Sequence, residues 1–182
     1  MKLSKVIIEN FRPYSHRVEF SIEQITAIIG KNDIGKSSIL DALDTFFNQS
    51  KLDIADRNIH SADNPVIIGC AFSDLPDEIV LDDSVLTTLE AEYLLNKDRQ
   101  LEIWKEYSAS GKESVFIVAV HPVNEPYDNL LQKKNAELKR LIQSAGLQDT
   151  VNQTINSEMR HALWKSLGDQ IKIGRASCRE RV

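Results

Sequence analysis

The sequence predicts an α/β fold in which a mixed β-sheet is flanked by helices. Short apolar segments alternate with polar turns, residues 24–30 form a strongly apolar run that ends in a glycine, and an amphipathic pattern follows soon after. The chain has 182 residues, of which 42% are hydrophobic and 27% charged, which is ordinary for a globular domain with one sizeable core.

The N-terminal third predicts three strands. Residues 2–10 alternate around Leu3 and Val6, and a turn at Pro13 leads to residues 16–22, whose period of two is typical of a half-buried strand. Residues 24–30 are apolar at nearly every position, which predicts a central strand covered on both sides.

The remaining elements follow from periodicity and turn residues. An apolar helix face is predicted after the glycine, made of Ile39, Leu40, Leu43, Phe46 and Phe47. The rest of the pattern predicts a loop at 51–64, a strand at 66–72, a connection with a short helix at 73–83, a helix at 86–96, hairpin strands at 99–108 and 112–122, and helices at 127–145 and 149–168.

Residues 30–37, GKNDIGKS, match the phosphate-binding pattern G-x-x-x-x-G-K-[ST]. The two glycines, Gly30 and Gly35, let the backbone curl so that successive N–H groups face phosphate oxygens. Lys36 supplies a positive charge for the β- and γ-phosphates, and the helix that follows adds its unpaired N–H groups and the positive end of its dipole. The pattern therefore predicts a P-loop that binds ATP.

The serines that follow the lysine complete the predicted site. The Ser37 hydroxyl is the predicted protein ligand of Mg²⁺, and Ser38 lies in the first helical turn near the α-phosphate. Asn32 is expected to organise the loop backbone. The predicted cofactors are thus ATP and Mg²⁺, and the predicted nucleotide-binding residues within the loop are Gly30, Asn32, Asp33, Ile34, Gly35, Lys36, Ser37 and Ser38.

Residues 2–47 resemble the N-terminus of the SMC, RecF and OLD (overcoming lysogenisation defect) class of ABC-type ATPases. That class opens with a strand, an Asn-Phe-Arg motif, a second strand and a P-loop of the form G-x-N-x-x-G-K-S-[ST]-[IL]-[IL]-[DE]-A. The matching residues are Asn10, Phe11, Arg12, Gly30, Asn32, Gly35, Lys36, Ser37, Ser38, Ile39, Leu40, Asp41 and Ala42. The fold that the resemblance implies is a truncated P-loop NTPase lobe of ABC/SMC-RecF type.

Asp33 favours one branch of this class, because SMC-like members usually carry glycine there, whereas G-K-N-D-x-G-K-S looks more like OLD-family nucleases. The resemblance implies an ATP-dependent DNA endonuclease whose TOPRIM module lies downstream, and two associated ATPase heads. It also makes Arg12 a candidate nucleotide ligand, although a surface arginine after a strand is an equal alternative. No catalytic residue is expected in this fragment, since neither a Walker B acid nor a signature motif follows Ser37.

Two other functions remain open at this point. The first is an ATP-driven DNA clamp or repair protein of RecF or SMC type without nuclease activity, and the second is a P-loop signalling or transport ATPase without a DNA partner. A downstream TOPRIM acidic cluster would favour the nuclease, and long heptad repeats would favour the clamp.

The C-terminus divides the chain into two expected parts. Residues 173–182, IGRASCRERV, resemble the translation of a sequencing adapter, so 1–172 is expected to be an incomplete ATPase lobe and 173–182 a non-native tail. The tail carries three Arg and one Glu, a net +2, and its removal changes the formal charge from −5 to −7.

Composition excludes several classes of protein. No apolar run approaches the about 20 residues of a membrane span, and the N-terminus lacks a secretory signal, so a cytoplasmic protein is expected. The acidic balance argues against a broadly basic nucleic-acid surface on this segment, and DNA is expected to bind through the intact protein. Cys70 and Cys178 are too few for a disulfide framework, and Cys70 is expected in the core.

Overall fold

The computed structural model describes residues 1–32, 34–48, 52–60, 63–82, 85–122, 125–127, 129–168 and 171–177. The chain divides into two compact units. The first comprises residues 1–74 and 102–116, and the second comprises residues 75–101 and 117–182. Strands β6 and β7 contribute residues to both units.

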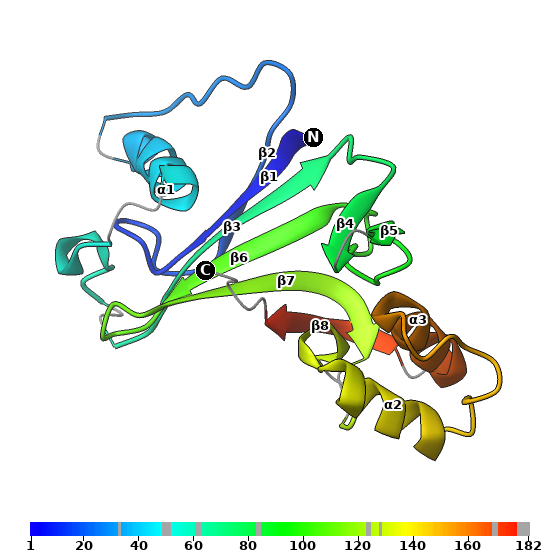
Figure 1. Cartoon of the computed structure of the whole chain (residues 1–182). Coiled ribbons are helices and arrows are strands. Elements are labelled where there is room, and N and C mark those ends of the chain that lie inside the picture. The colour runs from blue at the N-terminus through cyan, green and yellow to red at the C-terminus, as the bar shows by residue number, and fades with distance from the viewer. Residues whose placement is uncertain are drawn as a thin grey trace. The chain divides into compact units, whose positions relative to one another are not determined.

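The first unit is a sheet with one covering helix (Figure 1). Its strands are neighbours in the order β2-β1-β3-β6-β7, and β1 pairs antiparallel with both β2 and β3. The elements are β1 (Lys2–Glu9), β2 (Val18–Ser21), α1 (Lys36–Asn48), the 3-10 turn η1 (Ile54–Asp56), β3 (Val66–Ser73), β6 (Leu101–Tyr107) and the beginning of β7 (Glu113–Pro122).

Helix α1 packs against β1 and β3 through a narrow apolar face. Ile39, Ala42 and Phe46 are buried on that face, as expected from the period of the sequence. The predicted face was too wide, however, because Leu40 and Phe47 are 63% and 53% exposed. A single sheet layer covers only the part of the helix circumference that faces it.

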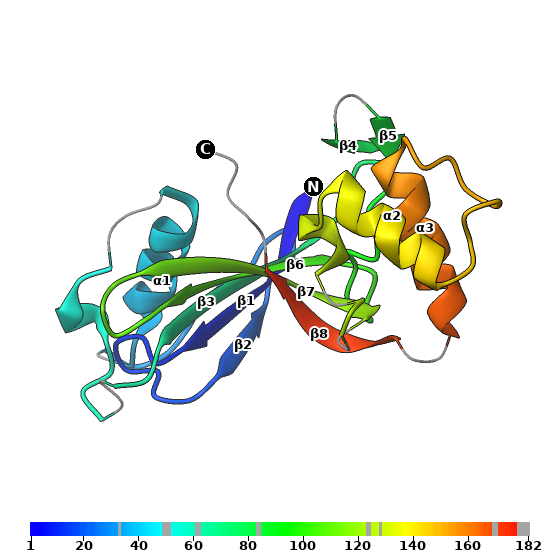
Figure 2. The ribbon, with the colours of Figure 1, turned by 60° about the horizontal axis from the view of Figure 1, so that its bottom comes forward.

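The second unit combines a two-stranded sheet with a helix pair. It contains β4 (Ile79–Asp82), β5 (Val85–Thr87), the end of β7, the 3-10 turn η2 (Leu130–Gln132), α2 (Asn135–Ser144), α3 (Asn156–Leu167) and β8 (Ile171–Ser177). Helices α2 and α3 pack side by side (Figure 2), and their core consists of Leu130, Leu138, Ile142, Met159, Leu163 and Trp164. β8 lies beside β7 and includes residues 173–177 of the segment predicted to be non-native, which stays a prediction.

The prediction of a central strand at residues 24–30 was wrong. The structure assigns no strand there, and the side chains of Ile25 and Ile29 are 92% and 90% exposed. A buried central strand needs hydrogen-bonded neighbours at both edges and a layer on each face. Within the described residues, no strand pairs with this segment, so its apolar composition does not lead to burial.

The predicted helix at 86–96 was also wrong, and so was the connection before it. Residues 79–82 and 85–87 form a hairpin, and turns occupy residues 89–93. Tyr93 has a φ of 54°, in the left-handed region that interrupts a helix.

The helix predicted to begin at residue 127 begins instead at Asn135. Asn129 has a φ of 51°, which is incompatible with a continuous right-handed helix. The Glu137 carboxylate accepts the backbone N–H of Lys134 at 2.8 Å and thereby fixes the N-terminus of α2.

The strand predictions for the rest of the chain are confirmed. β1, β3, β6 and β7 lie within a few residues of the predicted ranges, and Gly111 closes the β6–β7 hairpin with a φ of 79°. Cys70 is fully buried in β3, and burial raises the pKa of its thiol to about 12. None of the helices among the described residues has the length and hydrophobicity of a membrane span.

Candidate phosphate-binding site

The loop between residue 30 and α1 is closed by its own lysine. Lys36 is the first residue of α1, and its Nζ donates to the carbonyl oxygen of Gly30 at 2.8 Å and to that of Lys31. The Lys36 side chain therefore reaches from the first turn of α1 back to the beginning of the loop.

The two loop glycines stand where a side chain would meet other groups. Gly35 has a φ of 93°, and a Cβ there would lie 2.4 Å from Pro13 Cγ and 3.2 Å from the Tyr14 hydroxyl oxygen. A Cβ on Gly30 would lie 2.2 Å from Cδ1 of Ile34, which is the flexible end of a side chain. Gly35 is therefore the more strictly required of the two, for both conformation and space.

A cavity of about 400 Å³ opens at the N-terminus of α1. Its lining residues are Pro13, Asn32, Gly35, Lys36, Ser37 and Ser38. The first N–H groups of a helix have no partner within the helix, and the dipole places positive potential at the same end. Together with the Lys36 ammonium, these groups suit a chain of phosphates.

The serine at the cavity fits the expected magnesium ion. The Ser37 side chain is exposed and lines the cavity in the first turn of α1. In nucleotide sites Mg²⁺ keeps several waters and is held by phosphate oxygens and a few protein oxygens, and the Ser37 hydroxyl would be one of these. The described residues contain no group of three or more His, Cys, Asp or Glu side chains that could hold a metal ion.

Arg12 lies outside the residues that line the cavity. Its Nε donates to Asp56 Oδ1 at 2.9 Å, and its NH1 forms an ion pair with Asp41 Oδ2. The guanidinium also lies 5.2 Å from the centre of the Phe11 ring. Arg12 thus connects the first turns of α1 to the segment that follows the helix.

The structure brings together most of the predicted loop residues. Asn32, Gly35, Lys36, Ser37 and Ser38 line one cavity. Gly30 lies beside it through the Lys36 hydrogen bond, and Ile34 is 52% exposed. Asp33 lies outside the described residues.

Sequence reasoning missed the contribution of Pro13 and Tyr14. Both contact Gly35, and the Tyr14 hydroxyl donates to the Gly35 carbonyl oxygen at 3.0 Å. The turn at Pro13 was predictable from its residue type, but its contact with a loop 21 residues away left no local pattern. Of the acidic residues after α1, Asp53 caps η1 and Asp56 binds Arg12.

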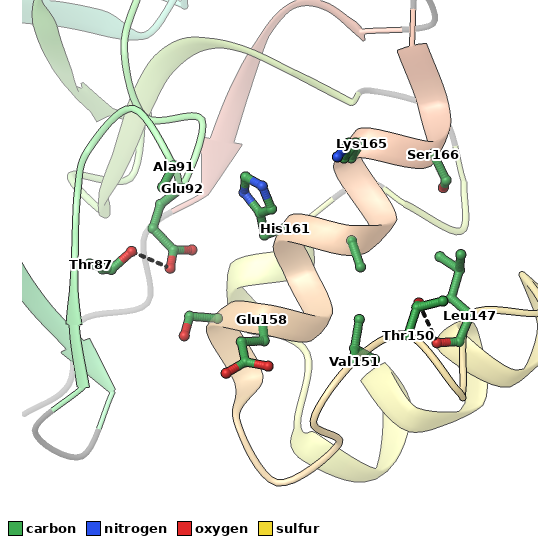
Figure 3. Close-up of a pocket in the computed structure, with 12 residues that line it drawn as sticks. Thr87, Ala91, Glu92, Leu147, Thr150, Val151, Glu158, His161, Lys165 and Ser166 are labelled. Atoms are coloured by element: carbon green, nitrogen blue, oxygen red, sulfur yellow. Dashed lines mark hydrogen bonds between the residues drawn. The ribbon is translucent and has the colours of Figure 1, made fainter.

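A second cavity, of about 560 Å³, lies in the second unit (Figure 3). His161 and Glu158 reach it from α3, and Glu92 and Thr87 form the opposite wall. The Glu92 carboxylate is buried and accepts from Arg160 at 2.8 and 3.1 Å and from the Thr87 hydroxyl at 3.1 Å. Two carboxylates, one lysine and His161 line this cavity, and one of the carboxylates, Glu92, is already paired with Arg160.

The conformation of Gly35 leads to a test of the phosphate loop. Replacing Gly35 with Ala should lower nucleotide affinity severely, because the new Cβ would displace Pro13 and the loop would change its course. Gly111→Ala is the matched control, since Gly111 has a φ of 79° but nothing within 4 Å of the added Cβ. Both variants incur the left-handed penalty of about 1–2 kcal/mol in stability. Only Gly35→Ala should lose binding in a titration with fluorescent ATP, and equal binding by the two variants would contradict this reading.

Comparison with known proteins links the site to a family. Residues 1–172 match the family model AAA_15, described as AAA ATPase domain. No curated protein matches the chain. Among solved structures, one described as "Structural biochemistry of ATP-driven dimerization and DNA stimulated activation of SMC ATPases" matches at 16% identity and a TM-score of 0.43, over 63% of this chain and 68% of that one.

Proposed function

This chain belongs to the AAA ATPase domain family, and we propose that its phosphate loop binds Mg-ATP to govern DNA cleavage by the intact protein. The observation that carries the nucleotide part is the position of the Lys36 ammonium, which closes a cavity at the N-terminus of α1. Lys36, Ser37 and Ser38 line that cavity in the first turn of a helix, and a cation, helix N–H groups and hydroxyls are the groups that bind a Mg-triphosphate.

Each residue of the loop has its own part of the nucleotide to bind. The Lys36 ammonium binds the β- and γ-phosphates, the Ser37 hydroxyl binds the magnesium ion, and Ser38 binds the α-phosphate. Asn32 and Gly35 shape the loop around them. Arg12 is held in ion pairs by Asp41 and Asp56, so we assign it to support of the loop rather than to direct contact with phosphate.

Equilibrium titration tests the nucleotide proposal directly. The 182-residue chain should bind an N-methylanthraniloyl ATP saturably in the presence of Mg²⁺, and ATP and ADP should compete. AMP should compete poorly, because it lacks the phosphates that the Lys36 ammonium serves. Absence of saturable binding, or equal competition by AMP, would contradict the proposal.

The nuclease part of the proposal rests on the resemblance of the loop sequence G-K-N-D-x-G-K-S to OLD-family proteins. Cleavage would require a metal-binding TOPRIM module elsewhere in the intact protein, and two ATPase heads would associate around ATP in the cytoplasm. Hydrolysis needs an acid that positions water and usually a group from a second subunit, so this chain alone should turn over ATP slowly or not at all.

A nuclease and a clamp differ in what each does to DNA. A nuclease should nick or linearise plasmid DNA with Mg²⁺ and ATP, whereas a RecF- or SMC-type clamp should retain DNA in an ATP-dependent manner without cutting it. DNA retention without cleavage would replace the nuclease proposal with the clamp and leave the nucleotide site unchanged.

A further inference from the structure

The turn formed by residues 12–14 packs directly against the phosphate loop. The Tyr14 hydroxyl donates to the carbonyl oxygen of Gly35 at 3.0 Å, and Pro13 Cγ occupies the space in which a Cβ on Gly35 would lie. The Tyr14 ring also makes an edge contact with Phe20, with centroids 5.7 Å apart. The ring is therefore held in place independently of its hydroxyl.

The turn is itself anchored by the segment that follows α1. The Arg12 backbone N–H donates to the Asp56 carbonyl oxygen at 2.7 Å, and Asn58 Nδ2 donates to the Arg12 carbonyl oxygen at 2.6 Å. Phe11 and Tyr14 exchange two backbone hydrogen bonds of 3.1 and 2.9 Å, and Phe11 is fully buried. Because these hydrogen bonds fix the turn, the turn can hold the phosphate loop that it contacts in a defined position.

The hydrogen bond from Tyr14 to Gly35 fixes the orientation of the peptide group at the start of α1. In a trans peptide, the carbonyl oxygen of Gly35 and the N–H of Lys36 point in opposite directions across one rigid plane. Fixing the oxygen toward Tyr14 therefore also fixes the direction of the Lys36 N–H, which is among the first N–H groups of the helix. A tyrosine hydroxyl keeps its proton at neutral pH and can donate, and partial burial raises the pKa of Tyr14 above its ordinary value.

We propose that Tyr14 is a positioning residue for nucleotide binding, whose hydroxyl orients the Gly35–Lys36 peptide toward the phosphates. This inference rests on the proposed nucleotide site and adds to it a residue outside the G-x-x-x-x-G-K-S pattern. Tyr14 touches no phosphate in this role. It acts through Gly35, and Asp56 and Asn58 hold it in place through Arg12.

Tyr14→Phe isolates the hydroxyl because it keeps the ring and its contact with Phe20. Titration of the 182-residue chain with N-methylanthraniloyl ATP should show roughly three- to ten-fold weaker binding, the value of one orienting hydrogen bond. The loss should be the same for ATP and ADP, which share the phosphates nearest the loop. The melting temperature without nucleotide should fall by only a few degrees, since one part-buried hydrogen bond contributes about 1 kcal/mol to stability, and the variant should remain folded during the titration.

Tyr127→Phe is the matched control, because Tyr127 packs against the helical core of the second unit and its substitution should leave affinity unchanged. Unchanged affinity in Tyr14→Phe would overturn the inference while leaving the nucleotide site intact. A fall in melting temperature that accounts for the lost affinity would also overturn it, by assigning Tyr14 to folding alone. Failure of the unsubstituted chain to bind would overturn both this inference and the proposed function.

Discussion

Lys36→Ala should reduce the affinity of the chain for Mg-ATP by on the order of 100-fold. The ammonium is the only cation among the described residues that line the phosphate cavity, and it also bonds to two carbonyl oxygens at the start of the loop. Its removal deletes the charge that a triphosphate needs and opens the loop that holds the other donors. Isothermal calorimetry or fluorescent ATP titration would measure the loss.

Lys31→Ala provides the matched control for this prediction. Lys31 belongs to the same loop and is exposed, but it contributes its backbone carbonyl rather than its ammonium to the contact with Lys36. Nucleotide affinity should therefore change little when its side chain is removed. Equal losses in the two variants would mean that general positive charge, and not the geometry of Lys36, attracts the nucleotide.

Arg160→Met should give the largest loss of stability. The Arg160 and Glu92 side chains are 2% and 1% exposed and form a two-point ion pair with N–O distances of 2.8 and 3.1 Å. Removing one partner leaves a carboxylate buried without its counter-ion, which costs about 3–5 kcal/mol in the free energy of unfolding. Urea denaturation followed by far-UV circular dichroism and by tryptophan fluorescence would report the shift; Trp164, in tilted contact with Tyr93, contributes to that fluorescence.

The double variant Glu92→Leu/Arg160→Met separates the charge effect from simple loss of packing. With both charges gone and apolar volume retained, most of the lost stability should return. Arg99→Met is the surface control, because the Arg99–Glu90 pair has equally good geometry but is largely exposed to water. An unfolding midpoint that drops as far in Arg99→Met as in Arg160→Met would refute the explanation by burial.

The phosphate loop was predictable because its requirements are local. Gly35 needs a positive φ, and Lys36 must be able to reach back across the loop. Both requirements are met by residue types that lie within a few positions of each other in the sequence. The half-buried strands were predictable for a similar reason, since a period of two reports which face of a single strand is covered.

The features that could not be predicted depend on contacts between distant segments. Glu92 and Arg160 are 68 residues apart, and nothing near either one marks it as a buried charge. Tyr14 and Gly35 meet across 21 residues, in a contact that only the folded turn creates. The prediction for residues 24–30 was wrong for a related reason. Their composition is that of a buried strand, but burial depends on neighbouring strands and layers that the composition of the segment does not encode.

The exposed isoleucines of that segment have a consequence for the colloidal behaviour of the chain. The five residues ITAII, from Ile25 to Ile29, lack charge and proline, the composition that promotes intermolecular β-association. Glu23 and Lys31 flank them as the nearest charges, and the net charge of −5 keeps copies apart at neutral pH. Solubility should therefore decline as carboxylates are neutralised by acid, while dilute protein near neutrality remains dispersed.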